Sequence, residues 1–258
     1  MILAVDIGNT NITLGIYKED KLFFITRLYT EKHKTSDELA AQIMNIFSLY
    51  NIDKSGFSGT VMSSVVPELT WPVSRAVKTV TGIAPVEVGA EHNGNLAVDV
   101  LPIEHLGADL ICGCVGAREK YRLPCLVIDM GTASKILAVD ESGKFVGCVI
   151  CPGVKISLDA LANGASLLPQ ISFTKPERVV GTNTVECMQS GTVYGTAAMI
   201  DGLIKRMKSE LHFDNAAVVA TGGYSKGIIP CCETEIVYDE NLVLDGLKFI
   251  YDEAKKCK

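Results

Sequence analysis

The sequence lacks any long run of apolar residues. Its apolar stretches are interrupted by glycine, proline or charged residues, and the first run, Ile2–Val5, is too short for the hydrophobic region of a signal peptide. We therefore expect a cytoplasmic protein with no membrane segment.

An excess of basic residues is also missing. The 24 lysines and arginines are outnumbered by 30 aspartates and glutamates, which gives a net charge of −6. Electrostatic binding of nucleic acids or of anionic membranes depends on lysine and arginine side chains that neutralise phosphates. We expect neither a nucleic acid nor a membrane as a partner.

The sequence also lacks the paired cysteine or histidine motifs that bind metals. The nine cysteines are scattered, and an odd number without a secretion signal indicates free thiols. Cys148 and Cys151 have the CxxC spacing, but neither a second cysteine pair nor a histidine pair accompanies them. We therefore predict that the cysteines are small buried apolar residues rather than zinc or redox ligands.

What the sequence does contain is enough apolar material for two cores, since 48% of its 258 residues are hydrophobic. The apolar and turn patterns predict strands and helices in the same order in both halves. In the first half the expected strands are 2–6, 12–17, 22–28 and 59–64, with helices at 36–49, from 67 and after 107. In the second half the expected strands are 125–129, 134–139, 144–151, 216–220 and 236–238, with helix-rich regions at 153–168 and 184–211 and a closing helix at 241–255.

An internal repeat supports this division. Residues 4–10 and 127–133 each consist of an apolar strand, an aspartate, any residue and a glycine, with a threonine soon after. Two such turns could arise independently, because aspartate and glycine are common turn residues. Their matching positions before a predicted hairpin instead favour two copies of one fold with the ligand between them. The predicted domains are 1–121 and 122–258.

The repeated turns suit a nucleotide. A glycine two residues after the strand lets backbone N–H groups approach anionic oxygens, and Asn9, Thr10 and Asn11 add further donors. Asp6 would repel phosphate directly, so we expect it to hold hydrated Mg²⁺ that bridges to the phosphates. Gly131 and Thr132 form the second turn, and Gly222 and Gly223 a third that could hold adenosine or ribose. The three turns in this order resemble those of the actin and sugar-kinase superfamily, and this resemblance implies an ATP-dependent kinase.

Asp109 is the candidate catalytic base. It follows Gly107 at the expected start of a helix, where its carboxylate could accept the proton of an acceptor hydroxyl. It could equally stabilise the first helical turn through the helix dipole. The residues alone leave both roles open.

The chain resembles the type III pantothenate kinases over nearly its whole length. The motifs that carry the resemblance are residues 6–10, 63–67, 107–109, 129–133, 152–153, 181–186, 189–191, 194–195 and 221–223. The resemblance implies an α/β fold of two similar ribonuclease-H-like (actin-like ATPase) domains with the active site in the cleft between them. It also implies ATP-dependent phosphorylation of pantothenate, the first step of coenzyme A biosynthesis. The implied cofactors are Mg²⁺ and a monovalent cation, K⁺ or NH4⁺, and the implied assembly is a homodimer.

The same resemblance assigns roles by position. It places the ATP phosphates against a loop from Asp6 to Thr13 that includes Gly8, and it makes Asp109 the general base. Asp129 would bind the monovalent cation, Thr132 would contact ATP, and Thr184 would contact the acyl substrate. The substrate segment would be Gly107, Ala108, Asp109 and Leu110.

The chain departs from the family pattern at the acceptor end. Leu110 stands where an arginine is expected to bind the pantothenate carboxylate, and leucine can make no such ion pair. Asp99 and Lys135 also replace the usual residues. Three readings follow: a pantothenate kinase that holds the carboxylate with another group such as Lys135, a kinase for another small hydroxylated acceptor, or a nucleotide-binding regulatory relative.

Overall fold

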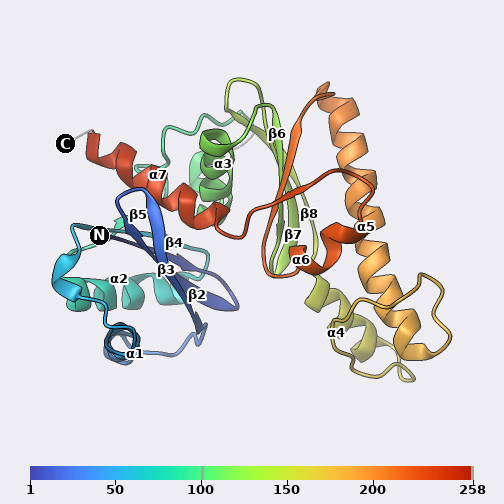
Figure 1. Cartoon of the computed structure of the whole chain (residues 1–258), viewed down its shortest axis with the longest axis horizontal. Coiled ribbons are helices and arrows are strands. Elements are labelled where there is room, and N and C mark those ends of the chain that lie inside the picture. The colour runs from blue at the N-terminus through green and yellow to red at the C-terminus, as the bar shows by residue number, and fades with distance from the viewer. Residues whose placement is uncertain (100–101, 257–258) are drawn as a thin grey trace. The chain divides into compact units, whose positions relative to one another are not determined.

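The computed structural model describes residues 1–99 and 102–256, which form two compact units. Unit 1 contains Met1–Glu119 together with the closing segment from Leu242, and unit 2 contains Lys120–Asn241 (Figure 1).

Unit 1 is built on a five-stranded sheet in the order β3-β2-β1-β4-β5. The strands are β1 (Ile2–Ile7), β2 (Asn11–Lys18), β3 (Lys21–Tyr29), β4 (Gly59–Ser64) and β5 (Val86–Glu87). The first three are antiparallel neighbours, whereas β4 and β5 run parallel to β1. Successive side chains of a strand point to opposite faces, so β1 presents Leu3, Val5 and Ile7 to one face and Asp6 to the other.

Helices cover both faces of this sheet. Those of unit 1 are α1 (Ser36–Leu49), α2 (Pro67–Thr81), α3 (Ala108–Lys120) and α7 (Leu242–Lys256), with short 3-10 turns at Lys54–Gly56 and Ile103–His105. The side chains of α1 and α2 share a core with Leu3, Val5 and Ile7, while α7 packs against β1 and β4. α1 starts with a capping box in which Thr35 and Glu38 satisfy each other's backbone N–H groups.

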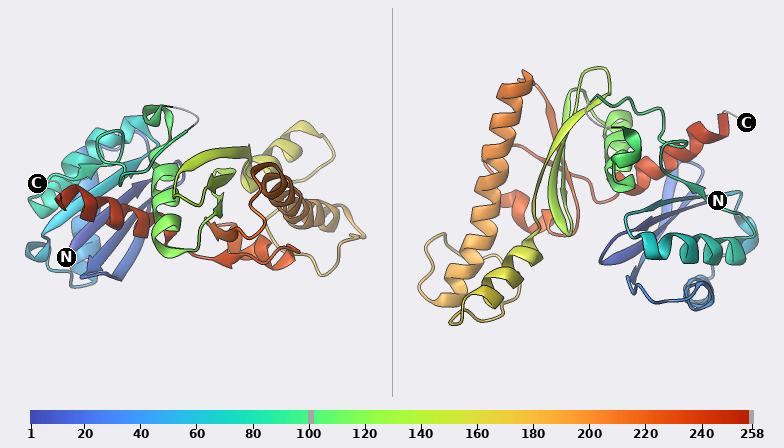
Figure 2. Two further views of the ribbon diagram at one scale, coloured as in Figure 1. Left: turned by 90° about the horizontal axis from the view of Figure 1, so that it is seen from above. Right: turned by 180° about the vertical axis from the view of Figure 1, so that it is seen from behind.

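Unit 2 repeats this architecture. Its sheet has the order β10-β9-β6-β7-β8, with β6 (Cys125–Met130), β7 (Ala133–Val139), β8 (Phe145–Pro152), β9 (Ala217–Thr221) and β10 (Val237–Tyr238). Its helices are α4 (Val154–Gly164), α5 (Thr184–Leu211) and α6 (Ser225–Ile228), followed by a 3-10 turn at Ile229–Cys231. α4 and α5 lie on the same side of the sheet and share a core with β6 and β7 (Figure 2).

The two sheets have one topology. β6 to β10 correspond in order and direction to β1 to β5, so each unit has a central strand paired antiparallel on one side and parallel on the other. The α/β fold with two similar halves, expected from the repeated turns, is therefore confirmed.

The units differ from the expected domains at the C-terminus. The sequence division placed 242–258 in the second domain, but α7 belongs to unit 1. The reason is packing: Gly246 lies directly against the backbone of Cys112 on α3, and Tyr251 donates a hydrogen bond to the carbonyl of Ser58 before β4. Contacts between such distant parts of the chain cannot be predicted from local sequence patterns.

One other expectation, the burial of the cysteines, needs correction. Cys112, Cys114 and Cys125 are buried as expected, but Cys148 and Cys187 are exposed. All eight cysteines within the described residues are free thiols, while Cys257 lies outside those residues. Among the helices the structure describes, none combines the length and apolar character needed to span a bilayer.

Candidate active site

Asp6 lies at the carboxyl end of β1, on the face of the sheet opposite the α1 and α2 core. Its register partners are Thr13 on β2 and Ser63 on β4. Ser63 is almost fully buried, and its Oγ donates a 2.6 Å hydrogen bond to Oδ1 of Asp6. The parallel pairing of β1 with β4 therefore fixes the direction of this carboxylate.

The turn after β1 is held by a residue from the end of β3. Thr30 donates through Oγ1 to the carbonyl of Gly8 at 2.7 Å and through its backbone N–H to the carbonyl of Thr10 at 2.9 Å. The side chains of Asn9, Thr10 and Asn11 are exposed beyond this fixed turn. They are placed where donors to a phosphate group would be useful.

Asp109 lies in the first turn of α3. Its Oδ1 accepts a 2.9 Å hydrogen bond from the backbone N–H of the next residue, Leu110. Gly107 is required beside it, because a Cβ at that position would lie 2.6 Å from the same carboxylate oxygen. The side chain of Leu110 is buried, so it forms part of the packing of α3.

A buried thiol connects these two carboxylates. Cys112, one turn after Asp109, is fully buried; burial, followed by the charges of Asp6 and Asp109, raises its pKa well above the ordinary value. A side-chain hydrogen bond with Ser63 has the smaller, opposite effect and lowers the pKa of Cys112. Unit 1 thus brings Asp6, Ser63 and Asp109 together around one thiol.

In unit 2, Asp129 takes the position that Asp6 takes in unit 1. It lies one residue before the end of β6, and its register partners are Lys135 on β7 and Thr221 on β9. Lys135 Nζ lies 3.1 Å from Oδ2 of Asp129. The side chains of both residues are mostly withdrawn from solvent, with exposed fractions of 13% and 19%.

Two glycines enclose the turn that follows Asp129. A Cβ on Gly153 would lie 2.1 Å from the carbonyl oxygen of Thr132, and one on Gly222 would lie 2.6 Å from the carbonyl of Met130. Gly222 also has a φ of +93°, which favours glycine. Gly131 and the exposed Thr132 are thereby held beside Gly222, and Gly223 is the exposed residue next to it.

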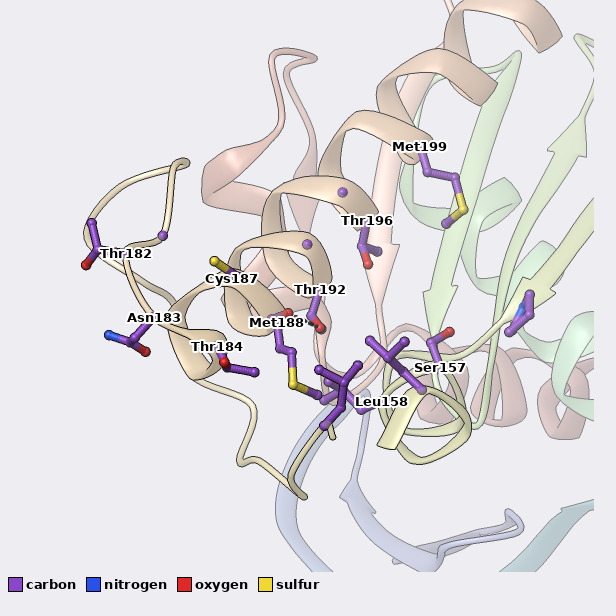
Figure 3. Close-up of a pocket in the computed structure, with 16 residues that line it drawn as sticks. Ser157, Leu158, Thr182, Asn183, Thr184, Cys187, Met188, Thr192, Thr196 and Met199 are labelled. Carbon is purple, nitrogen blue, oxygen red and sulfur yellow. Dashed lines mark hydrogen bonds between the residues drawn. The ribbon is translucent and has the colours of Figure 1, made fainter. Parts of the chain in front are cut away.

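Thr184 begins α5 and lines a separate cavity of unit 2 with a volume of about 850 Å³. Figure 3 shows Met188, Thr192 and Thr196 on the side of α5 that faces Leu158 of α4. The helix start is well capped: Asn183 accepts from the N–H of Glu186, whose carboxylate accepts from Thr182. The lining of this cavity does not include Asp129, Gly131 or Thr132.

Comparison with known proteins decides the family. The family model for type III pantothenate kinases matches residues 2–206. A type III pantothenate kinase from Exiguobacterium sp. is 38% identical over 256 residues, which is 99% of this chain and 100% of the relative. One from Shouchella clausii is 40% identical and covers 98% of this chain and 99% of its own length.

The chain belongs to the type III pantothenate kinase family.

A solved structure supports the fold alone. The activator of the 2-hydroxyisocaproyl-CoA dehydratase from Clostridium difficile with bound ADPNP is 14% identical and superposes with a TM-score of 0.62 over 99% of this chain and 96% of its own. The α/β fold of two similar halves is therefore shared with this activator.

The site has too few carboxylates to surround a metal ion with protein ligands alone, and it suits a cation that keeps part of its water shell. No cluster of three or more histidine, cysteine, aspartate or glutamate side chains suited to a metal occurs among the residues that the structure describes. Mg²⁺ commonly uses one or two carboxylates and completes its shell with water and phosphate oxygens. The carboxylate of Asp6 fits that requirement.

Sequence reasoning missed two residues of this kinase site. Thr30 had no role assigned to it, and Ser63 was noted only as part of a matching motif. Both act on residues far away in the chain, Ser63 across 57 positions and Thr30 across 22. Only the pairing of β1 with β4 and the position of the end of β3 reveal them.

Proposed function

We propose that this chain transfers the γ-phosphoryl group of ATP to the primary hydroxyl of pantothenate, forming 4′-phosphopantothenate and ADP in the cytoplasm. The observation that carries the proposal is the convergence of Asp6 and Asp109 in unit 1. Asp6 lies one residue before the end of β1 and Asp109 lies in the first turn of α3, and the charges of both carboxylates raise the pKa of the buried Cys112 thiol. Family relatives of 38% and 40% identity support pantothenate as the acceptor.

Asp109 acts as the general base. A new bond forms between the acceptor oxygen and phosphorus while the bond from phosphorus to the ADP oxygen breaks, and Asp109 takes the hydroxyl proton. The Leu110 N–H and the missing side chain at Gly107 hold Oδ1 in one direction. A carboxylate that is already oriented does not need to reorganise during the reaction.

The glycine turns hold the nucleotide. In unit 1, Asn9, Thr10 and Asn11 face solvent from a turn fixed by Thr30, and Thr13 lies beside Asp6 in the register. In unit 2, Thr132 and Gly131 lie beside Gly222 and Gly223. Mg²⁺, when bound at Asp6, would neutralise phosphate charge; Ser63 orients the carboxylate that holds it.

The acceptor carboxylate must be held by a group other than Leu110. The Leu110 side chain is 9% exposed and carries no donor. Gly107, Ala108 and Asp109 still form the expected substrate segment, and Thr184 is the candidate contact in unit 2. A different hydroxylated acceptor is the alternative that this substitution keeps open.

The proposal includes a homodimer, with Thr184 close to the interface. The exposed apolar side chains of unit 2 are concentrated in the segment 154–185, where Thr184 also lies. Those in the segment are Ile156, Leu161, Leu167, Val179, Val180 and Val185, whereas Ile150, Val237 and Tyr238 lie outside it. Exposed apolar residues concentrated in one segment are typical of a protein interface.

The deciding experiment is ADP release from ATP and Mg²⁺ with and without pantothenate. We expect release that depends on pantothenate, and Asp109→Asn should reduce kcat by about 10²- to 10⁴-fold while leaving nucleotide affinity nearly unchanged. Full turnover by Asp109→Asn would remove the general-base role. Nucleotide binding without a pantothenate effect would point to another acceptor or to a regulatory protein.

A further inference from the structure

Asp129 carries an ion pair where the family resemblance implies a bound monovalent cation. The 3.1 Å contact joins Lys135 Nζ to Asp129 Oδ2. The two residues are direct register partners on antiparallel strands β6 and β7, so the pair is set by the sheet and not by a mobile loop.

Both side chains lie on the face opposite the α4 and α5 core. Ile128 and Met130 on β6 and Ile136 on β7 point into that core, so Asp129 and Lys135 point away from it together. Their small exposed fractions separate this pair from the solvent-exposed pair of Lys155 and Asp159 on α4, whose side chains are 70% and 40% exposed. Pairs that are shielded from water interact more strongly than exposed ones.

The donor set around Asp129 does not suit K⁺. A potassium ion needs oxygen ligands, whereas the lysine ammonium offers three donors and no acceptor. A second cation at the same carboxylate would also lie close to a like charge. An alkylammonium group does match NH4⁺ in charge and in its N–H donors.

We infer that the Lys135 ammonium is a tethered replacement for the monovalent cation at Asp129, so that this chain binds and uses Mg·ATP without added K⁺ or NH4⁺. The turnover part of this inference rests on the proposed function, and the nucleotide-binding part does not. The inference also assigns Lys135 a different role from that of holding the acceptor carboxylate, because its ammonium is already paired with Asp129.

The test is the cation dependence of nucleotide binding. A non-hydrolysable ATP analogue with Mg²⁺ is titrated calorimetrically into the protein in choline chloride, KCl or NH4Cl at constant ionic strength. We expect the wild-type Kd to stay within about twofold in all three salts. Lys135→Met should weaken binding about tenfold in choline, and KCl or NH4Cl should restore it.

Two further variants make the test specific. Lys155→Met removes a lysine from the exposed pair on α4 and should show no cation dependence. Lys135→Arg retains a positive charge and should behave as wild type, and Lys135→Gln replaces Lys135→Met if the latter does not fold. Thermal unfolding without nucleotide gives a second readout: KCl should raise the Tm of Lys135→Met and not that of the wild type.

Three outcomes would overturn the inference. The first is a wild-type protein that requires K⁺ for nucleotide binding. The second is weak binding by Lys135→Met that neither cation restores. The third is a Lys135→Met variant with unchanged nucleotide binding in choline and a raised KM for pantothenate, which would assign Lys135 to the acceptor. Failure of pantothenate-dependent ADP release would affect the proposed function alone, because the binding and unfolding measurements do not depend on it.

Discussion

Ser63 Oγ donates a 2.6 Å hydrogen bond to Oδ1 of Asp6, and the two residues are register partners on parallel strands. A hydrogen bond to a charged group contributes about 1.5–3 kcal/mol, and a buried donor has few alternative partners. The serine therefore restricts the carboxylate to one orientation on the face of the sheet where α3 also lies.

Ser63→Ala should weaken the binding of Mg·ATP by about tenfold, since Asp6 loses its orienting donor. The Kd of the nucleotide, measured at several Mg²⁺ concentrations, checks this. Ser58→Ala, just before the opposite end of β4, serves as the matched control and should bind as wild type. An unchanged Kd in Ser63→Ala would mean that Asp6 does not need this contact to bind the metal and nucleotide.

Gly107→Ala should lower kcat with little effect on folding. The new Cβ would lie 2.6 Å from Oδ1 of Asp109, so the carboxylate must move away from its position. Small displacements of a catalytic group can cost about 10²-fold in rate. Steady-state kinetics together with the Tm test the idea, and Gly89→Ala, whose Cβ would meet no atom within 4 Å, provides the comparison. Equal kcat values in the two variants would argue against a tightly placed base.

Gly222→Ala should destabilise unit 2, unlike the same change at its neighbour. Gly222 has φ +93°, and a Cβ there would lie 2.6 Å from the backbone of Met130, which cannot move aside like a flexible side chain. The positive φ costs about 1 kcal/mol and the overlap about 1–3 kcal/mol, so the Tm should fall by several degrees. Gly223→Ala should keep the wild-type Tm, because nothing lies within 4 Å of its Cβ position. If Gly223→Ala nevertheless weakens nucleotide binding, the predicted role of Gly223 is supported; similar Tm values for both variants would contradict the packing argument.

Local patterns predicted much of this fold because they describe single strands and helices. The strand before Asp6 and the one before Asp129 were predicted from short apolar runs ended by turn residues, and the two sheets contain them at equivalent positions. The sequence predicts a helix-rich region over 184–211, and the single helix α5 begins and ends at those residues.

Contacts between distant segments were not predictable in this way. α7 joins unit 1 because glycines at 116 and 246 let helices α3 and α7 approach closely, and neither position looks unusual in the sequence. Trp71 has the large apolar side chain typical of a core residue, yet it is 64% exposed, and the guanidinium of Arg75 lies over its ring, 5.4 Å from the centroid. The ion pair of Lys135 with Asp129 depends on the exact register of one hairpin, which hydrophobic periodicity alone does not specify.

Asp201→Asn should destabilise unit 2 at neutral pH and have little effect in acid. Burial raises the pKa of Asp201, but hydrogen bonds from the N–H groups of Glu233 and Thr234 outweigh it, so the net shift is downward. A lowered folded-state pKa gives stability that is present above the unfolded pKa of about 3.9 and is lost as pH falls through the folded value. We expect a loss of about 1–2 kcal/mol in the free energy of unfolding at pH 7, shrinking below about pH 3.

Urea unfolding followed by circular dichroism at pH 7, 5 and 3 measures this difference. Asp159→Asn removes a carboxylate from an exposed pair on α4 and should change stability little at any pH. A difference between wild type and Asp201→Asn that persists unchanged at pH 3 would show that the amide, rather than the lost charge, causes the effect.

Leu161→Glu should dissociate the proposed homodimer. Leu161 is 45% exposed and lines the same cavity as Thr184, within the segment that carries the exposed apolar residues of unit 2. A buried, unpaired carboxylate would make an interface at this position unfavourable, whereas the same group is well solvated in a monomer. Sedimentation velocity should show a dimer for wild type and a monomer for Leu161→Glu, while Leu49→Glu on α1, 73% exposed, should remain dimeric.

If Thr184 contacts the acceptor at the interface, the monomeric variant should also have a raised KM for pantothenate with an unchanged Kd for the nucleotide. A monomeric wild type, or a dimer that tolerates Leu161→Glu, would place the apolar residues of segment 154–185 outside any dimer interface.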